Sequence, residues 1–126
     1  MQRELKFRVW DKLSERFARC DEGYQGHYVL SLKGEFHNLQ NGSGGDECIV
    51  QQWTGLKDKN EKEIYEGDIV KATSDQYENE NFVGKVIFDL GQFLTWIHKN
   101  DIRGIWGEDD IEVIGNIFEN PELLES

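Results

Sequence analysis

Phe82-Val83-Gly84-Lys85-Val86-Ile87-Phe88 is the stretch of this 126-residue chain that best indicates its fold. It is rich in the β-branched and aromatic residues that favour strands. Asp89-Leu90-Gly91 has the composition of a tight turn, and Phe93-Leu94-Thr95-Trp96-Ile97 is a second strand-like run. The sequence therefore predicts two strands joined by a turn over residues 82–97.

Further strand-like segments lie on both sides of this pair. Residues 5–10 alternate apolar and basic side chains, which predicts a half-buried strand with Leu5, Phe7 and Val9 on one face. Runs of β-branched and aromatic residues predict additional strands at 28–32, 48–54, 63–65, 69–72 and 111–117. The strands are short and are separated by residues that favour turns.

This pattern predicts a mainly β fold, either a small SH3-like barrel or two packed β-barrel-like subdomains. Asn120-Pro121-Glu122 has a capping residue, a proline and an acid in the order of a helix start, so we expect a short C-terminal helix. The length fits a single β-rich domain over residues 1–126. Residues 38–47 are small, polar and glycine-rich, which predicts a flexible loop.

The chain is strongly acidic, with 25 acidic against 14 basic residues and a net charge of −11. Residues 64–126 carry fourteen acidic and four basic residues, a sum of −10, so most of the charge lies in the second half. Such a field opposes binding to the phosphates of nucleic acid. Net charge therefore disfavours a nucleic-acid partner without excluding one, because residues 1–20 carry six basic and three acidic residues, a local sum of +3.

Neither a membrane segment nor an export signal is present in the sequence. No window approaches the ~20 continuous apolar residues of a membrane span, and the charged N-terminus lacks the apolar core of a signal peptide. We therefore expect a cytoplasmic protein that does not contact a membrane. The two cysteines, Cys20 and Cys48, are too few for a disulfide scaffold and are expected to be thiols.

Metal-binding and catalytic patterns are also lacking. Cys20, His27, His37 and Cys48 carry suitable ligand atoms, but their spacing is too long for a zinc motif. His27, His37 and His98 have no local signature of nucleophilic catalysis. We therefore predict no catalytic residues, no metal and no cofactor, and a protein that is not an enzyme.

One acidic cluster is a candidate partner surface. It consists of Glu108, Asp109, Asp110 and Glu112. Its carboxylates can be presented to a basic partner, and oxygen ligands also suit a weakly bound Ca²⁺ or Mg²⁺. The spacing differs from that of an EF-hand loop, and a solvated turn explains the cluster more simply.

Four blocks of sequence together are similar to a known family. They are Lys6-Phe7-Arg8-Val9-Trp10-Asp11, residues 52–70 containing Gln-Trp-Thr-Gly-Leu-Lys-Asp and Tyr-Glu-Gly-Asp-Ile-Val, residues 84–89, and residues 112–124. The combination resembles the YopX family of small phage and prophage proteins. The resemblance implies a β-rich fold and a viral or prophage origin, and it brings no catalytic residues because the family has no established activity. The chain departs from the pattern at Glu61-Lys62, where a turn-forming glycine would often stand.

We interpret several residues in these blocks as determinants of the fold. They are Trp10, Trp53, Gly67, Asp68, Gly115, Asn116 and Pro121. A tryptophan beside a turn can bury its ring while its N–H is paired. Gly-Asp and Asn residues form tight turns in which the side chain accepts backbone N–H bonds.

The leading hypothesis for function is a non-enzymatic phage accessory protein that acts through protein–protein contact. Its partners are expected to be other copies of itself and an unknown host or phage protein, because exposed strands such as Leu5–Trp10 can pair between copies. The alternative is a nucleic-acid-linked regulator. In that case the acidic half imitates DNA, or an SH3-like barrel with a basic N-terminal strand and exposed aromatic residues binds RNA.

Overall fold

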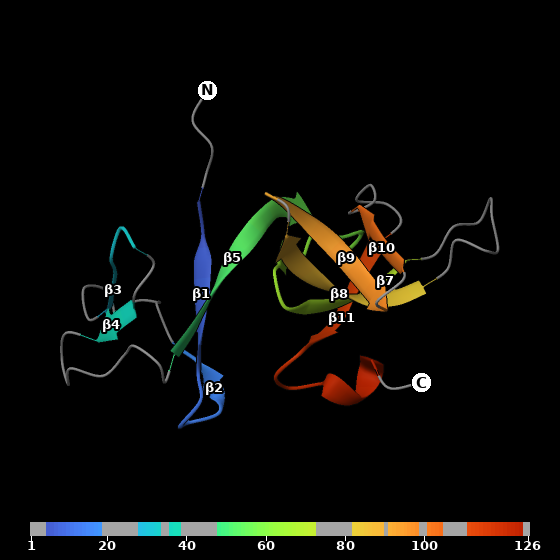
Figure 1. Cartoon of the computed structure of the whole chain (residues 1–126). Coiled ribbons are helices and arrows are strands. Elements are labelled where there is room, and N and C mark those ends of the chain that lie inside the picture. Colours follow the sequence, from blue (N-terminus) through green and yellow to red (C-terminus); the bar gives the residue numbers. More distant parts are fainter. Residues whose placement is uncertain are drawn as a thin grey trace. The chain divides into compact units, whose positions relative to one another are not determined.

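The computed structural model is built almost entirely of β-strands (Figure 1). It describes residues 5–18, 28–33, 36–38, 48–72, 82–89, 91–98, 101–104 and 111–124. The chain divides into two compact units, residues 6–52 and residues 53–126 together with 1–5, and each unit is described by itself. The expectation of one domain over residues 1–126 stays a prediction.

The first unit, residues 6–52, contains an antiparallel ladder. Its strands are β1 (Phe7–Asp11), β2 (Arg16–Phe17) and the first half of β5 (Cys48–Lys57). Over its whole length β1 pairs with β5, from Phe7 opposite Gln52 to Asp11 opposite Cys48. A separate antiparallel pair is formed by β3 (Tyr28–Leu30) and β4 (Phe36–Asn38). The predicted loop begins at the last residue of β4, and residues 39–47 lie outside the described residues.

The apolar face predicted for β1 is buried only in part. Val9 and Trp10 are buried, and the Trp10 ring meets the edge of Phe17 with 5.0 Å between the ring centroids. Leu5 and Phe7 are exposed instead. The strand was predicted correctly from its period, but its N-terminal half keeps its apolar side chains in contact with solvent.

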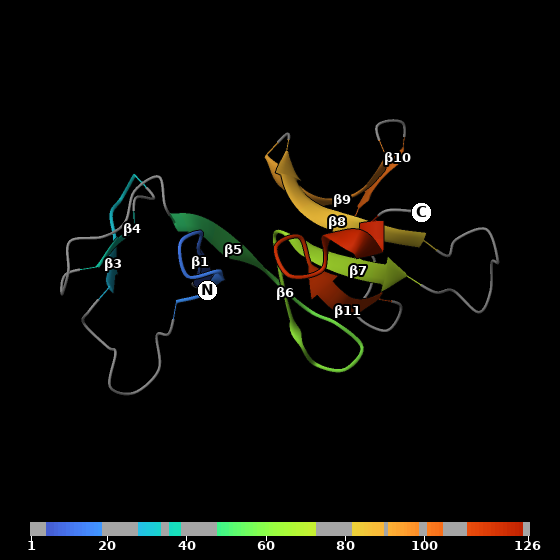
Figure 2. The same cartoon turned by 90° about the horizontal axis from the view of Figure 1, so that it is seen from below.

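The second unit contains a five-stranded antiparallel sheet in the order β10-β9-β8-β7-β11. Its strands are β7 (Asp68–Ala72), β8 (Phe82–Asp89), β9 (Gln92–His98), β10 (Asp101–Gly104) and β11 (Ile111–Asn116). The strands β8 and β9 are the pair predicted over residues 82–97. A meander whose first strand also pairs with the last strand is the order of an SH3-like barrel, and the sheet is curled (Figure 2). The predicted mainly β fold is confirmed.

Alternate residues of neighbouring strands form the core of this sheet. The core residues are Ile64, Val70, Ala72, Val86, Ile111 and Val113, with Leu56 and Phe82 packed against them. Ile64 comes from β6 (Glu63–Tyr65), which pairs with the second half of β5. Gly84 in β8 permits a close approach to β9, because an added Cβ would lie 2.7 Å from the Trp96 carbonyl oxygen.

The predicted short C-terminal helix is confirmed as the 3-10 helix η3 (Pro121–Leu124). Pro121 is its first residue and Glu122 lies in its first turn, as expected for the start of a helix. No helix among the described residues has the length and apolar character needed to cross a membrane.

Candidate functional site

Buried polar side chains are the first place to look for chemistry, because burial without a function or a partner is costly. Those in the described part of the chain are Gln51, Asp58, Asp68, Thr95 and Asn116. Only the Thr95 hydroxyl among the described buried side chains has no hydrogen-bond partner. The other four side chains form hydrogen bonds within the fold.

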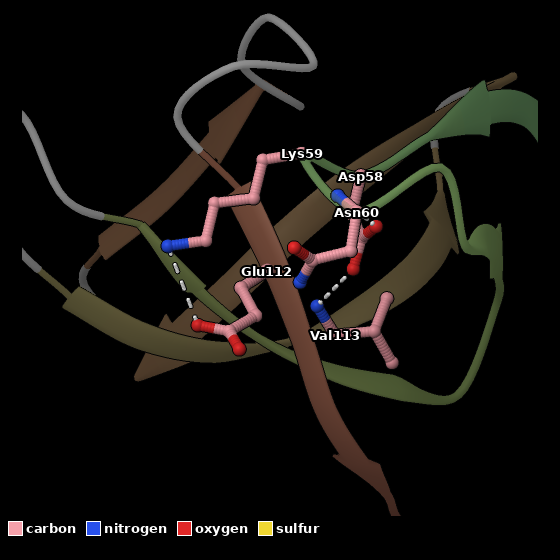
Figure 3. Close-up of polar contacts among 5 residues, drawn as sticks. All are labelled: Asp58, Lys59, Asn60, Glu112 and Val113. Atoms are coloured by element: carbon pink, nitrogen blue, oxygen red, sulfur yellow. Dashed lines mark hydrogen bonds and ion pairs between the residues drawn. The ribbon is translucent and has the colours of Figure 1, made fainter.

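Asp58 is the most heavily used of these side chains. One carboxylate oxygen, Oδ2, accepts the Val113 N–H at 2.8 Å (Figure 3). The other, Oδ1, accepts the N–H groups of Asn60 at 2.8 Å and Lys62 at 2.9 Å. Because Val113 lies in β11, this single carboxylate both closes the β5–β6 turn and attaches it to the five-stranded sheet.

The same contacts control the ionisation of Asp58. Burial by itself raises the pKa of the carboxyl, but the hydrogen bonds from Val113, Lys62 and Asn60, with the charge of Lys62, outweigh burial and place the pKa below its ordinary value. The carboxylate is therefore ionised at neutral pH. Since its oxygens already accept backbone N–H groups, it is poorly suited to proton transfer, which requires a group poised near the working pH.

Lys59 completes the attachment of this turn to β11. Its backbone N–H donates to the Ile111 carbonyl oxygen at 2.9 Å, and its ammonium lies 3.5 Å from a Glu112 carboxylate oxygen (Figure 3). Glu112 is the described member of the predicted acidic partner surface, and it is half-exposed and paired with Lys59. The other members, Glu108, Asp109 and Asp110, lie outside the described residues.

Glu61 has the backbone conformation of the turn-forming glycine that the family pattern often places here. Glu61 has a φ of 64°, in the left-handed region that favours glycine. Its N–H still donates to the Asp58 carbonyl oxygen at 2.9 Å. The chain therefore adopts the conformation of a glycine turn with a glutamate.

Gly67 and Asp68 form the tight turn between β6 and β7. Gly67 has a φ of 86°, and its N–H donates to the Val86 carbonyl oxygen at 2.7 Å. Asp68 is buried, and its Oδ2 accepts the Tyr65 N–H at 2.8 Å. The Asp68 carboxylate thus stabilises the backbone of the turn that the sequence pattern indicated.

Gly115 and Asn116 organise the end of β11. Asn116 Oδ1 accepts the N–H groups of Phe118 at 3.0 Å and Glu119 at 2.9 Å, and its amide donates to a Glu119 carboxylate oxygen at 2.8 Å. Asn120 packs closely on Gly115, where an added Cβ would lie 2.6 Å from Asn120 Oδ1. A side chain at position 115 would therefore displace Asn120.

The remaining predicted determinants lie at packed or terminal positions. Trp53 donates its indole N–H to the Leu56 carbonyl oxygen at 2.9 Å, and Trp10 is buried against Phe17. Pro121 opens η3 on the surface. These placements agree with structural roles for these residues, although the effect of replacing each of them stays a prediction.

Metal-ligating side chains do not gather in the described part of the chain. No three His, Cys, Asp or Glu side chains there lie close enough together to hold a metal ion. Cys48 is a half-buried thiol on β5, and His37 and His98 belong to β4 and β9. Cys20 and His27 lie outside the described residues.

Exposed apolar side chains and sheet edges remain as the candidate surface for binding. The exposed large apolar residues are Leu5, Phe7, Leu13, Leu32, Phe88, Ile102 and Leu123. Phe7 and Ile102 differ from the others because each lies on a strand that no other described strand pairs with along part or all of one side: β1 away from its short pairing with β2, and β10 at the end of its sheet. The strand β10 is not recognisable from the sequence, because its four residues contain a single large apolar side chain, Ile102, between two charged ones.

The fold and these surfaces define a small, mainly β protein with an SH3-like strand order. The YopX family, described as "YopX protein", matches residues 6–125. This chain therefore belongs to the YopX family, which confirms the resemblance found in its sequence.

Similar proteins support this assignment. The chain is 43% identical over 70 residues to the SPbeta prophage-derived uncharacterized protein YopX of Bacillus subtilis (strain 168), a match over 51% of this chain and about half, 52%, of that protein. The crystal structure of B. subtilis YopX is similar with a TM-score of 0.63, 28% identity and 95% of each chain covered. That of EF1440 from Enterococcus faecalis has a TM-score of 0.62 and 26% identity, covering 98% of this chain and 100% of that chain.

Proposed function

We propose that this protein is a non-enzymatic accessory protein of a phage or prophage that acts through protein–protein contact and associates with copies of itself. The observation that carries the proposal is the exposure of apolar side chains on strands with an outer side. Phe7 on β1 is 41% exposed and Ile102 on β10 is 46% exposed. The prophage origin of the B. subtilis relative supports the biological setting.

An exposed apolar residue on an edge strand favours association for two reasons. Its burial contributes about 25 cal/mol for each Å² of apolar surface removed from water. The backbone of the same strand carries N–H and C=O groups that can pair with a further strand. A scattered apolar residue on a loop, such as Leu13, offers only the first of these contributions.

The polar interior supports a role other than catalysis. Asp58, Asp68 and Asn116 use their oxygens to accept backbone N–H groups. A general base or nucleophile needs a reactive atom directed at a substrate. These three side chains are instead engaged in holding turns.

Salt dependence separates self-association from binding to a charged partner. Two copies, each with a net charge of −11, repel one another, and salt screens that repulsion. This repulsion outweighs the attraction of a few exposed ion pairs between the copies, so self-association should strengthen as salt rises. Capture of a basic host protein by the acidic half, or binding of RNA by the basic N-terminal segment, should weaken.

Sedimentation or light scattering over a range of concentrations, at low and high salt, tests the proposal. We expect an oligomer whose population grows with both variables. A chain that stays monomeric at the highest concentration in both buffers would refute self-association. A retarded RNA band that disappears as salt rises would support the alternative function in place of this one.

A further inference from the structure

The two edges of the five-stranded sheet differ in what covers them. At the β11 edge, the Ile111 carbonyl oxygen accepts the Lys59 N–H at 2.9 Å, and the Val113 N–H donates to Asp58 Oδ2 at 2.8 Å. The β5–β6 turn thus occupies one acceptor and one donor that another strand would use, and Figure 3 shows the contact between Asp58 and Val113. This edge is closed to pairing with a second molecule.

The β10 edge lies at the other end of the same sheet. Ile102 of this strand pairs with Trp96, directly after a register shift between Asp101 and Ile102, and its side chain is exposed. Asp101 and Arg103 flank it and form an ion pair within the strand, with 3.0 Å between Arg103 Nε and Asp101 Oδ1. Both of these charged side chains are about one-third exposed. Ile102 therefore lies between two residues of opposite charge whose side chains share the other face of the strand, where the Arg103 guanidinium also lies 5.0 Å from the centroid of the Phe82 ring.

We propose that β10 is the interface between two copies of this chain. The copies pair through antiparallel β10 strands related by a twofold axis at Ile102. In that register Ile102 faces its own equivalent, Asp101 faces Arg103 of the second copy, and Arg103 faces Asp101. The inference rests on the self-association proposed above and specifies the surface that produces it.

Self-complementarity is the physical reason for this register. Directly opposite residues of an antiparallel pair contact one another, and opposite charges there stabilise the pair. A twofold interface uses the same surface on both copies. The strand must therefore be complementary in charge and shape to a second copy of itself that runs in the opposite direction. The sequence Asp-Ile-Arg at 101–103 meets this requirement because its reverse places each charge opposite the other sign.

The apolar contact also continues beyond the two isoleucines. Lys85, Trp96 and Ile102 form one row across β8, β9 and β10, and the Lys85 ammonium lies 4.7 Å from the centroid of the Trp96 ring. Pairing at Ile102 joins this row to its copy. The isoleucines are then buried between two tryptophans, and each tryptophan is flanked by its lysine.

The strand β1 does not match itself in this way. A twofold axis at Phe7 would place Lys6 opposite Arg8, and an axis at Arg8 would place two arginines face to face. Like charges directly opposite one another destabilise a strand pair. Charge therefore favours β10 over β1 as the edge that recognises a second copy, although both strands expose an apolar residue.

A charge-reversal series in the full chain tests the register. Asp101→Arg alone should weaken dimerisation about tenfold, since each substitution acts twice in a twofold interface. The double variant Asp101→Arg/Arg103→Asp should return affinity to near the wild-type value, because it restores opposite charges. Ile102→Asn should also weaken it about tenfold, and the matched variant Phe7→Asn on β1 should change it less than twofold.

Sedimentation equilibrium measures these affinities, with circular dichroism to establish that each variant folds. A monomeric wild type would refute the self-association itself. A wild-type oligomer that is unaffected by the β10 variants and weakened by Phe7→Asn would refute the β10 interface and leave the proposed function standing. Failure of the double variant to recover affinity, with its fold intact, would refute the register.

A cysteine probe gives an independent result that does not depend on weakened association. In the proposed pair the two Ile102 Cα atoms directly oppose each other, at a separation within the range of a disulfide. Under mild oxidation Ile102→Cys should form a covalent dimer, while Leu13→Cys in the β1–β2 turn should form far less. Equal crosslinking of the two variants would count against the interface.

Discussion

The β1–β2 turn and the β5–β6 turn have similar local structures but differ in their contacts with the rest of the fold. Each starts with Asp-Lys, at Asp11 and Asp58. In each turn the aspartate side chain accepts N–H groups of residues that follow it in the sequence. Each also contains a glutamate at positive φ, Glu15 at 53° and Glu61 at 64°. The two turns therefore share an aspartate that accepts the N–H of the residue two positions later, and a glutamate in the left-handed region.

The two aspartates differ in burial and in whether one carboxylate oxygen contacts a distant strand. Asp11 lies near the surface, and its carboxylate accepts the N–H groups of two neighbouring residues, Leu13 at 2.9 Å and Ser14 at 3.3 Å. Asp58 is only 3% exposed, and its second oxygen accepts the N–H of Val113, 55 residues further along the chain. The comparison teaches that the energetic importance of a turn aspartate depends on the distant strand it contacts, and four predictions test this.

The largest expected effect is at Asp58. Asp58→Ala should lower the free energy of unfolding by about 3 kcal/mol, because the buried N–H of Val113 and the partly buried N–H groups of Asn60 and Lys62 lose a charged acceptor. Asp58→Asn should lower it by about half as much, since one oxygen acceptor remains. Urea unfolding measures both losses. A loss below about 1 kcal/mol for the alanine variant would contradict the role assigned to the contact with Val113.

Acid should remove the stabilising contribution of the aspartate in both turns. The pKa of Asp58 is lowered because hydrogen bonds outweigh burial, and that of Asp11 is lowered because Ser14, Leu13 and Arg16 outweigh burial. A folded-state pKa below the unfolded value means that each carboxylate stabilises the fold above its unfolded pKa of ~3.9 and loses that contribution as pH falls through its folded pKa.

Urea unfolding from pH 6 to pH 2 checks this expectation. The stability difference between the wild type and Asp58→Asn should shrink as the pH falls below about 4. The corresponding difference for Asp11→Asn should be smaller throughout, because that carboxylate is closer to solvent. A wild-type advantage over Asp58→Asn that grows in acid would contradict the sign of the shift.

The positive-φ glutamates provide a test in which the turns should behave alike. Glu61→Gly and Glu15→Gly should each raise stability by about 0.5 kcal/mol, because glycine relieves left-handed strain and offsets part of that gain through its larger unfolded-state entropy. Thermal or urea unfolding measures both. A gain at one turn and a loss at the other would show that the strain depends on tertiary context.

A loss as small as those gains is expected from Asp11→Ala. Its two local hydrogen bonds are accessible to water, so their loss should cost about 0.5 kcal/mol. Urea unfolding alongside Asp58→Ala provides the direct comparison. Equal losses at the two positions would eliminate burial and long-range contact as the source of the difference.

Sequence patterns predicted the parts of the fold that depend on neighbouring residues. The strands β8 and β9, the terminal helix and the mainly β architecture follow from residue type, period and turn composition. The missing glycine at Glu61-Lys62 pointed to a real feature, the positive φ of Glu61. The four sequence blocks indicated the YopX family, and the match of the family to residues 6–125 confirmed it.

Other features escaped prediction because they arise between segments. The alternation of residues 5–10 indicated one apolar face but not that Phe7 would remain exposed. The β10 strand is too short and too charged to be recognised by its composition. The contact of Asp58 with Val113 has no signal in the sequence, because the two residues lie 55 positions apart.

The sequence alone determined that the chain forms short, half-buried strands joined by Gly, Asn and Asp turns, because those preferences act over a few neighbouring residues. The tertiary structure alone decided which sheet edge is closed and which apolar residues stay exposed. That outcome depends on where the strands meet: the β5–β6 turn reaches β11, and the Asp58 carboxylate finds a backbone N–H there.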